Sequence, residues 1–136
     1  MTLKFSKRSA ANLAECCEEL QEVFEEVLRS GFDCSVLVGS RDEATQNEMY
    51  RTGRSKLAWP NSMHNVSPLS LAVDVAPYPI DWDDKERFIY FGGQVVGIAA
   101  AMGIKLRWGG AWNGERNKPG RFDDLVHFEI KEGRNE

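Results

Sequence analysis

The feature that most constrains the fold of this sequence is the run from Leu71 to Pro77, in which a single carboxylate interrupts an apolar segment. The run is short, rich in valine and alanine, and ended by a proline, which is typical of a β-strand. Because side chains alternate along a strand, the residues at odd positions fall on one face and Asp74 falls on the other. We therefore expect Asp74 to project from a rigid strand with only small alanine neighbours beside it.

The chain has two histidines, and each has an acidic residue close by in sequence. His64 precedes the strand in a segment rich in Asn, Ser and Pro, and His127 opens a second β-like run that ends at Ile130. Two imidazoles and one carboxylate suit a zinc ion whose fourth position is left for water. The alternatives are that the histidines lie at the surface or are hydrogen-bonded in the core, and that the aspartate accepts a hydrogen bond from a nearby backbone amide. The spacing alone leaves both interpretations open.

The bulk properties bound the class of protein. A chain of 136 residues that is 42% hydrophobic predicts one domain, residues 1–136, with a core of its own. We see no apolar run of membrane-spanning length and no signal-peptide pattern, and therefore expect synthesis in a host cytoplasm. The net charge of −4 offers no basic stripe for nucleic acid. Three cysteines, two of them adjacent, argue against a disulfide framework and against a cysteine-based zinc site.

Periodicity predicts an α+β fold. Apolar residues at three- and four-residue intervals predict one helix from a cap at Ser6 or Ser9 to Leu28, ending before Gly31. The other expected elements are a strand at 34–38, a helix at 42–52, a long loop at 54–70, a helix opened by Asp83-x-x-Glu86 and stopped by Gly103, a strand at 104–107, a glycine-rich loop at 108–122 and a strand at 127–130. This order predicts helices packed on one side of a small, mostly antiparallel sheet.

Several short motifs in a fixed order resemble those of a known enzyme family. The elements Ser62-x-His64, Ala72-x-Asp74 and Asp124-x-x-His127 resemble the zinc signature of the D-Ala-D-Ala-type metallopeptidases, which share a fold with the hedgehog signalling domain. Within that group the chain is most similar to single-domain phage endolysins of the L-alanyl-D-glutamate peptidase type, through Phe5-Ser6-x-x-Ser9, Gly39-x-Arg41-x-x-x-x-Gln46, Trp108-Gly109-Gly110 and His127-Phe128-Glu129. Asp74 follows His64 by ten positions where the usual pattern has seven, which leaves the path of this loop open.

The resemblance implies a role for each matched residue. It implies that His64, Asp74 and His127 hold Zn²⁺ and that Asp124 is the acid and base of catalysis, with Asp123 as the fallback. The other interpretation of Asp124 is a turn residue or the partner of a histidine.

Five further residues have a possible role at the site, and some of them also have a purely structural interpretation. Arg41 matches the family arginine that polarises the scissile carbonyl, or it pairs with an acidic neighbour, Asp42 or Glu43, at a helix start. Ser62 matches a serine that positions substrate, or it is a simple loop hydroxyl, and Gln46 would support the same pocket. Trp108 would wall a peptide groove together with Trp112, or belong to the core. Glu129 is a candidate partner for the second ring nitrogen of His127.

The function that this resemblance implies is zinc-dependent hydrolysis of the peptidoglycan stem peptide, at the bond between L-Ala and D-Glu. The enzyme would act as a monomer on the cell wall, after the host membrane has been permeabilised. Two alternatives stay open: a D-alanyl-D-alanine carboxypeptidase with the same chemistry, and a zinc-containing binding module without catalysis. Asp124 and Arg41 favour the enzyme, because a module without catalysis needs neither.

Overall fold

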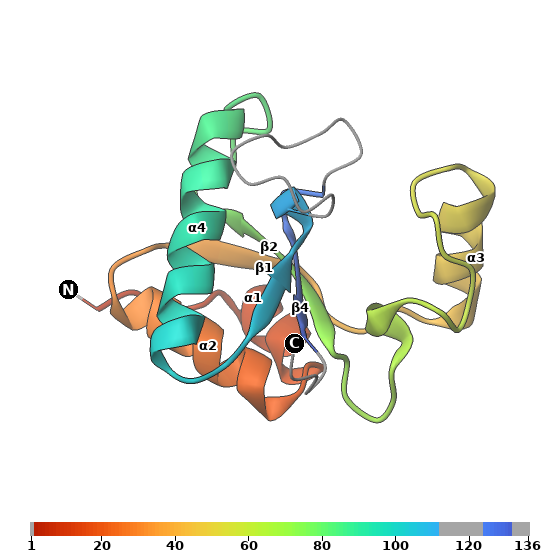
Figure 1. Ribbon diagram of the computed structural model, residues 1–136, viewed down its shortest axis with the longest axis horizontal. Coiled ribbons are helices and arrows are strands. Elements are labelled where there is room, and N and C mark those ends of the chain that lie inside the picture. The colour runs from red at the N-terminus through yellow and green to blue at the C-terminus, as the bar shows by residue number, and fades with distance from the viewer. Residues whose placement is uncertain (1, 112–123, 132–136) are drawn as a thin grey trace.

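A computed structural model of the chain describes residues 2–111 and 124–131. Its centre is a four-stranded sheet in the order β1-β2-β4-β3, with every neighbouring pair antiparallel (Figure 1). The strands are β1 (Cys34–Val38), β2 (Ala72–Pro77), β3 (Leu106–Trp108) and β4 (His127–Ile130). The expected α+β class with an antiparallel sheet is confirmed.

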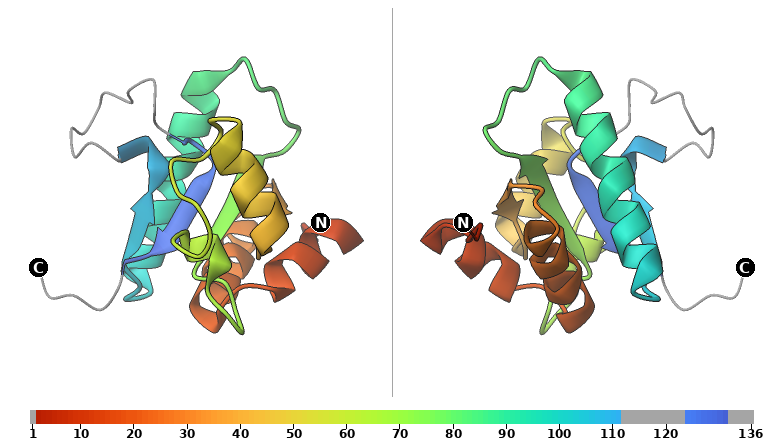
Figure 2. Two further views of the ribbon diagram at one scale, coloured as in Figure 1. Left: turned by 90° about the vertical axis from the view of Figure 1, so that its right-hand side faces the viewer. Right: turned by 90° about the vertical axis from the view of Figure 1, so that its left-hand side faces the viewer.

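Helices cover the two faces of the sheet unequally. Helices α2 (Glu18–Arg29) and α4 (Lys85–Ala101) pack against each other on one face, and α3 (Glu43–Arg51) stands on the other side, away from the rest (Figures 1 and 2). Helix α1 (Lys7–Ala14) contacts β1. The face of the sheet that α2 and α4 leave uncovered is therefore the one available for a site.

The hydrophobic core fills the space between the sheet and helices α2 and α4. Phe128 of β4 is fully buried there and meets Phe24 of α2 edge to face, with ring centroids 5.4 Å apart. Phe91 of α4 approaches the same ring from another side, at 6.3 Å. Burying a side chain of this size stabilises the fold by roughly 1.5–3 kcal/mol. Because side chains alternate along β4, the residues on either side of Phe128 face away from this core.

The expected single helix from Ser6 to Leu28 is wrong, because the chain breaks between α1 and α2. Cys17 is extended, with φ −62° and ψ 163°, and its amide donates to the carbonyl of Ser70 at 2.9 Å. The Ser70 amide in turn donates to the carbonyl of Glu15 at 2.9 Å. These bonds to a residue far along the chain replace helical bonds, which local periodicity cannot reveal. They also give the path of the loop between His64 and Asp74, which reaches the junction of α1 and α2.

Other boundaries differ by a few residues. Helix α3 starts one residue later than expected, with Asp42 as its cap. Helix α4 is capped by Asp84 rather than Asp83, since the Asp84 carboxylate accepts from the amide of Arg87. Strand β3 lies two residues later than expected at its start. The long loop at 54–70 contains a short 3₁₀ turn, η1 (Met63–Asn65), and the expected glycine-rich loop begins with a second one, η2 (Gly109–Ala111). Trp112 and the rest of that loop lie outside the described residues.

Two expectations from composition can be compared with the described part of the chain. Cys16, Cys17 and Cys34 are all buried and carry free thiols. Among residues 2–111 and 124–131, no helix combines the length and the apolar character that crossing a bilayer requires.

Trp108, expected at a substrate groove, is instead packed against α4. A Cβ atom at Gly92 would lie 2.3 Å from its ring, so this helix position admits only glycine. The ring cannot easily swing away, because its indole N–H donates to the carbonyl of Leu125 at 2.9 Å. Gly92 and Trp108 together hold the segment that leads into β4.

We expect alanine substitutions at two glycines of α4 to have opposite effects. Gly97→Ala meets no atom within 4 Å and should raise the free energy of unfolding by about 0.5–1 kcal/mol, because alanine favours the helix. Gly92→Ala should lower it by roughly 1–3 kcal/mol through the clash with Trp108. Urea unfolding of both variants checks this, and equal shifts would contradict the close packing of Trp108.

Candidate metal centre and cleft

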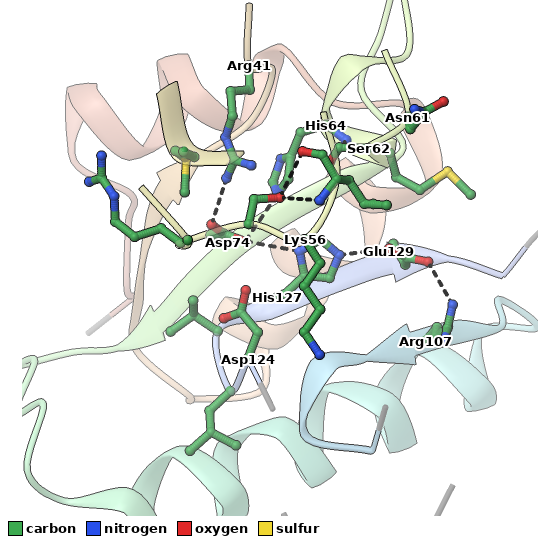
Figure 3. Close-up of a pocket in the computed structure, with 18 of the residues that line it drawn as sticks. Arg41, Lys56, Asn61, Ser62, His64, Asp74, Arg107, Asp124, His127 and Glu129 are labelled. Atoms are coloured by element: carbon green, nitrogen blue, oxygen red, sulfur yellow. Dashed lines mark hydrogen bonds and ion pairs between the residues drawn. The ribbon is translucent and has the colours of Figure 1, made fainter. Parts of the chain in front are cut away.

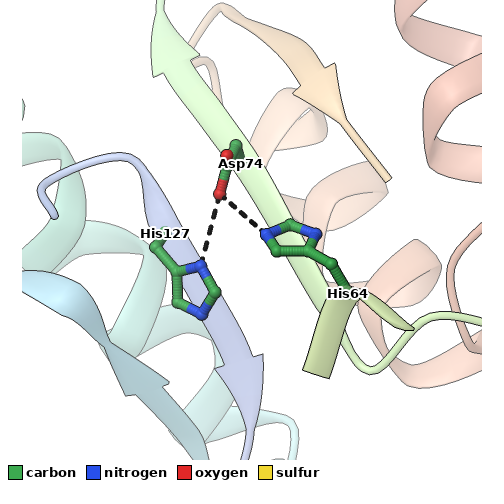
Figure 4. Close-up of side chains that lie close together, drawn as sticks. All are labelled: His64, Asp74 and His127. Atoms are coloured by element: carbon green, nitrogen blue, oxygen red, sulfur yellow. Dashed lines mark hydrogen bonds and ion pairs between the residues drawn. The ribbon is translucent and has the colours of Figure 1, made fainter. Parts of the chain in front are cut away.

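The cross-strand register brings the predicted ligands together on the open face of the sheet. Asp74 of β2 lies directly opposite His127 of β4, and His64 reaches the same point from the turn η1 (Figure 4). One carboxylate oxygen, Asp74 Oδ1, lies 3.2 Å from His64 Nε2 and 3.3 Å from His127 Nδ1. The three donor atoms lie within 4.8 Å of one another, and all three residues are buried. The part of the chain that the structure describes contains no second such group.

The other nitrogen of each histidine is already bonded. His64 Nδ1 lies 2.7 Å from the carbonyl oxygen of Gly39, and His127 Nε2 lies 2.8 Å from Glu129 Oε1. A carbonyl and a carboxylate only accept, so each of these nitrogens carries the proton. Neutral rings would then present their lone pairs toward Asp74. This is the arrangement of histidines that ligate metals in proteins, and Glu129 has the position expected for a partner of His127.

The electrostatics of the cluster favour a carboxylate flanked by positive charge. Burial alone would raise the pKa of Asp74, but the hydrogen bonds from His127 and His64 outweigh it and hold this pKa well below its usual range. Burial likewise opposes charge on His127, yet the bonds to Asp74 and Glu129 raise its pKa to about 9. A proton or another cation between these groups is therefore stabilising.

Local capping fixes the turn that carries His64. Ser62 precedes the turn, and its hydroxyl accepts from the backbone amide of His64 at 3.2 Å. Its own amide donates to the side-chain oxygen of Asn65 at 3.0 Å, which completes a capping box. Ser62 also lines the cleft, so it has a structural task whether or not it touches a substrate.

Arg41 points at the cluster. One guanidinium nitrogen lies 3.6 Å from Asp74 Oδ2, on the side away from the histidines, and another donates to Gln46 Oε1 at 3.0 Å (Figure 3). Of the two alternative partners, Asp42 and Glu43, Asp42 uses its side chain to cap α3 instead, and the side-chain partners of Arg41 are Asp74 and Gln46. Arg41 is therefore built into the site and not into a helix-start ion pair.

Gln46 and Trp108, two of the predicted substrate residues, do not line the cleft. Gln46 is fully buried, and its amide group bonds Arg41, Asn65, Ser55 and the carbonyl of Leu57. It therefore joins α3 to the following loop and orients Arg41. This agrees with the expected support role of Gln46, and Trp108 has the packing role described above, which is the core alternative.

Asp124 lies in the cleft beside His127, and its backbone is anchored at both ends. Its amide donates to the carbonyl of Gly109 at 3.1 Å, and its carbonyl accepts from the amide of His127 at 3.1 Å. The approach to Gly109 is close enough that a Cβ there would lie 2.0 Å from the Asp124 carbonyl oxygen. Burial raises the pKa of the Asp124 carboxyl, and the charge of Asp74 raises it further. Asp123, the fallback, lies outside the described residues.

The cluster forms one wall of a cleft with a volume of about 1040 Å³ (Figure 3). The lining includes residues that the sequence did not single out, above all the cations Arg54, Lys56, Lys85 and Arg107. They come from a loop, a helix start and a strand, so no local pattern connects them. Trp82, which stacks on Phe88 with centroids 5.4 Å apart, forms another part of the lining.

This fold and site define a class of small peptidases, and comparison with known proteins identifies the family. The model of the phage L-alanyl-D-glutamate peptidase family matches residues 1–131, and the chain belongs to this family. The L-alanyl-D-glutamate peptidase of Escherichia phage T5 is 33% identical over 137 residues, which cover 98% of this chain and 93% of that protein.

Solved structures agree with this assignment. The L-Ala D-Glu endopeptidase ChiX of Serratia marcescens is 30% identical, with a TM-score of 0.73 over 95% of this chain and 90% of that chain. The D,D-pentapeptidase VanY of the VanB-type resistance cassette, solved as the E175A mutant with Zn(II), is 16% identical. Its TM-score is 0.51, over 96% of this chain and 76% of that one. At that identity the likeness to VanY concerns the fold alone.

Gln46→Leu should destabilise the chain, although the two side chains are similar in size. The change removes the hydrogen bonds of a fully buried amide to Arg41, Asn65, Ser55 and the Leu57 carbonyl, which we expect to cost about 1–3 kcal/mol of unfolding free energy. It should also lower turnover, because Arg41 loses its support. Urea unfolding checks the first effect, with Gln94→Leu at a half-buried position of α4 as the matched control. Equal stability of the two variants would contradict the role of Gln46.

Proposed function

We propose that the chain is a zinc-dependent peptidase that hydrolyses the stem peptide of peptidoglycan between L-alanine and D-glutamate. The observation that carries the proposal is the buried His64, Asp74 and His127 cluster in the cleft of a chain of this family. The phage T5 and Serratia relatives, both at least 30% identical over nearly the whole chain, are named for this activity. No observation on the chain favours a carboxypeptidase or a module without catalysis over this function.

The chemistry of the donor set fits a zinc ion. With the outer nitrogens of both histidines bonded to Gly39 and Glu129, two lone pairs and a carboxylate oxygen would face one another. Such a set of acceptors is stable only around a cation or a proton, and two imidazoles with one carboxylate suit Zn²⁺. A zinc ion held by these three residues would act as a Lewis acid and make a water molecule easier to deprotonate.

Asp124 is our choice for the residue that moves protons. It lines the cleft beside His127, and burial raises the pKa of its carboxyl, which makes it a better base than an exposed aspartate. In the proposed mechanism Asp124 accepts a proton from the attacking water. It then returns the proton to the amine nitrogen that leaves when the peptide bond breaks.

Arg41 is our choice for the residue that binds the carbonyl oxygen. Its guanidinium is held beside Asp74 by the bond to Gln46 and is mostly buried, so its charge acts in a partly desolvated cleft. A planar group with several N–H donors suits an oxygen that gains negative charge as water attacks. Because Arg41 is already oriented before substrate arrives, little reorganisation is needed during the reaction.

We further propose that residues 1–136 act as one domain and as a monomer, on the cell wall of a phage-infected bacterium. The buried core draws on both chain halves, from Leu13 to Phe128, which supports a single folding unit. The family's phage origin supports action on the wall during lysis, after the membrane has been permeabilised.

Mass analysis of fragments released from purified peptidoglycan tests the proposed function. We expect a new amino terminus at D-glutamate and a new carboxyl terminus at L-alanine. Release of free D-alanine would instead indicate a carboxypeptidase. Intact stem peptides after incubation of the zinc-loaded protein would indicate a binding module without catalysis.

Asp124→Asn should keep the fold and the metal content but lower turnover by roughly 10²–10⁴, because the amide cannot accept the proton. The matched control is Asp83→Asn, at an exposed position outside the cleft lining, which should keep wild-type turnover. Peptide hydrolysis and metal analysis on both variants check this. Wild-type turnover in Asp124→Asn would contradict its role in proton transfer and point to Asp123 instead. Loss of zinc in this variant would show that Asp124 is a metal ligand.

A further inference from the structure

Positive charge gathers around the cleft, although the whole chain carries a net charge of −4. Besides Arg41, the lining contains Arg54 and Lys56 from the loop after α3, Lys85 from the start of α4, and Arg107 from β3. Among the residues that the structure describes, the carboxylates that line the same cleft are Asp74, Asp124 and Glu129, which belong to the candidate site. A cleft lined by this many cations suits a ligand that brings negative charge of its own.

The order of the strands gives the cleft a direction. Arg41 follows β1 and Arg107 lies in β3, so these two arginines stand at opposite edges of the sheet, with Asp74 and His127 between them. The backbone of Asp124 is bonded to Gly109, which directly follows β3. Arg41, proposed to bind the carbonyl oxygen, therefore lies toward the β1 edge of the sheet. Asp124, proposed to protonate the leaving nitrogen, lies toward the β3 edge.

A peptide bound in this cleft would place the residue that follows the scissile bond toward β3. The carbonyl oxygen of the scissile bond would lie at Arg41, and the nitrogen of the same bond would lie toward Asp124. The residue that contributes this nitrogen continues in the same direction, which leads to Arg107. Within a peptide, a glutamate residue keeps one free carboxylate whichever of its two carboxyls forms the next bond.

Arg107 is suitably placed and shaped to receive that carboxylate. It pairs across the strands with Glu129, and its guanidinium lies 3.6 Å from Glu129 Oε2, while Oε1 of the same carboxylate bonds His127 (Figure 3). Its side chain is 53% exposed although it lines the cleft. A guanidinium carries five N–H donors in a planar fork, so an ion pair with Glu129 is compatible with a second carboxylate.

We propose that Arg107 binds the free carboxylate of the D-glutamate residue and thereby selects an acidic residue after the scissile bond. The inference rests on the proposed function, since it assumes cleavage before D-glutamate. Lys56 extends from the opposite loop toward the side of the cleft that holds Asp124, and adds positive charge to the same region (Figure 3). Arg107 is then a specificity residue, distinct from the residues that move protons or hold the metal.

The competing role for Arg107 is purely structural. If the arginine only steadies Glu129, and through it His127, its removal would weaken the site for every substrate alike. The two roles separate when the substrate carboxylate and the arginine are removed independently, as in a double-mutant cycle.

The test measures kcat/KM for two peptides that differ only at the free carboxylate of D-glutamate, which one peptide carries as an amide. We expect the wild type to prefer the carboxylate peptide by roughly 10- to 50-fold, as for a hydrogen bond to a charged group. Arg107→Ala should lose this preference. Its kcat/KM for the carboxylate peptide should fall, mainly because KM rises, while its kcat/KM for the amide peptide stays within about twofold of the wild-type value. Arg107→Lys should keep part of the preference.

The matched control is Arg29→Ala, which removes an exposed arginine that also pairs with a glutamate but lies on α2, outside the cleft. It should retain the full preference. Equal loss on both peptides in Arg107→Ala, together with reduced zinc content, would overturn the inference in favour of the structural role. A wild type that cleaves both peptides equally would overturn it and leave the proposed function intact. A wild type that cleaves neither would overturn both.

Discussion

The structure depends on the burial of one carboxylate, Asp74, in the middle strand pair of the sheet. An ionised carboxylate away from water costs several kcal/mol unless other groups compensate its charge. Here His64, His127 and Arg41 supply that compensation from three different segments, so each segment must take a defined position. The turn at Ser62, the pairing of β2 with β4, and the bond from Gln46 to Arg41 all serve this requirement.

The alternation of side chains in β2 and β4 separates this polar cluster from the hydrophobic core. Val73 and Phe128 pair across the strands on the side of α2 and α4, and the next pair, Asp74 and His127, faces the cleft. A slip of one residue between β2 and β4 would exchange the two faces. The core therefore fixes the geometry of the site, since the register that buries Phe128 also sets His127 opposite Asp74.

Much of this arrangement could be predicted from the sequence, because it follows from local patterns. The strand around Asp74, the strand at His127 and the helix near 42–52 all have clear signals within a few residues. The break after α1 could not be predicted, because hydrogen bonds to the distant Ser70 cause it. The choice between a core and a groove position for Trp108 could not be made from the sequence, because burial decides it and a motif contains no information on burial. The cations around the cleft come from separate segments of the chain, and they lie near one another only in the folded structure.

The most direct test of the account is a crystal structure of the zinc-loaded protein with anomalous diffraction recorded at the zinc absorption edge. If these residues hold zinc, one strong anomalous peak should lie at about 2.0–2.2 Å from His64 Nε2, His127 Nδ1 and a carboxylate oxygen of Asp74. The outer nitrogens of both histidines should keep their bonds to Gly39 and Glu129. A peak at other residues, or none between these three in active protein, would contradict the central claim that this buried cluster is a zinc site.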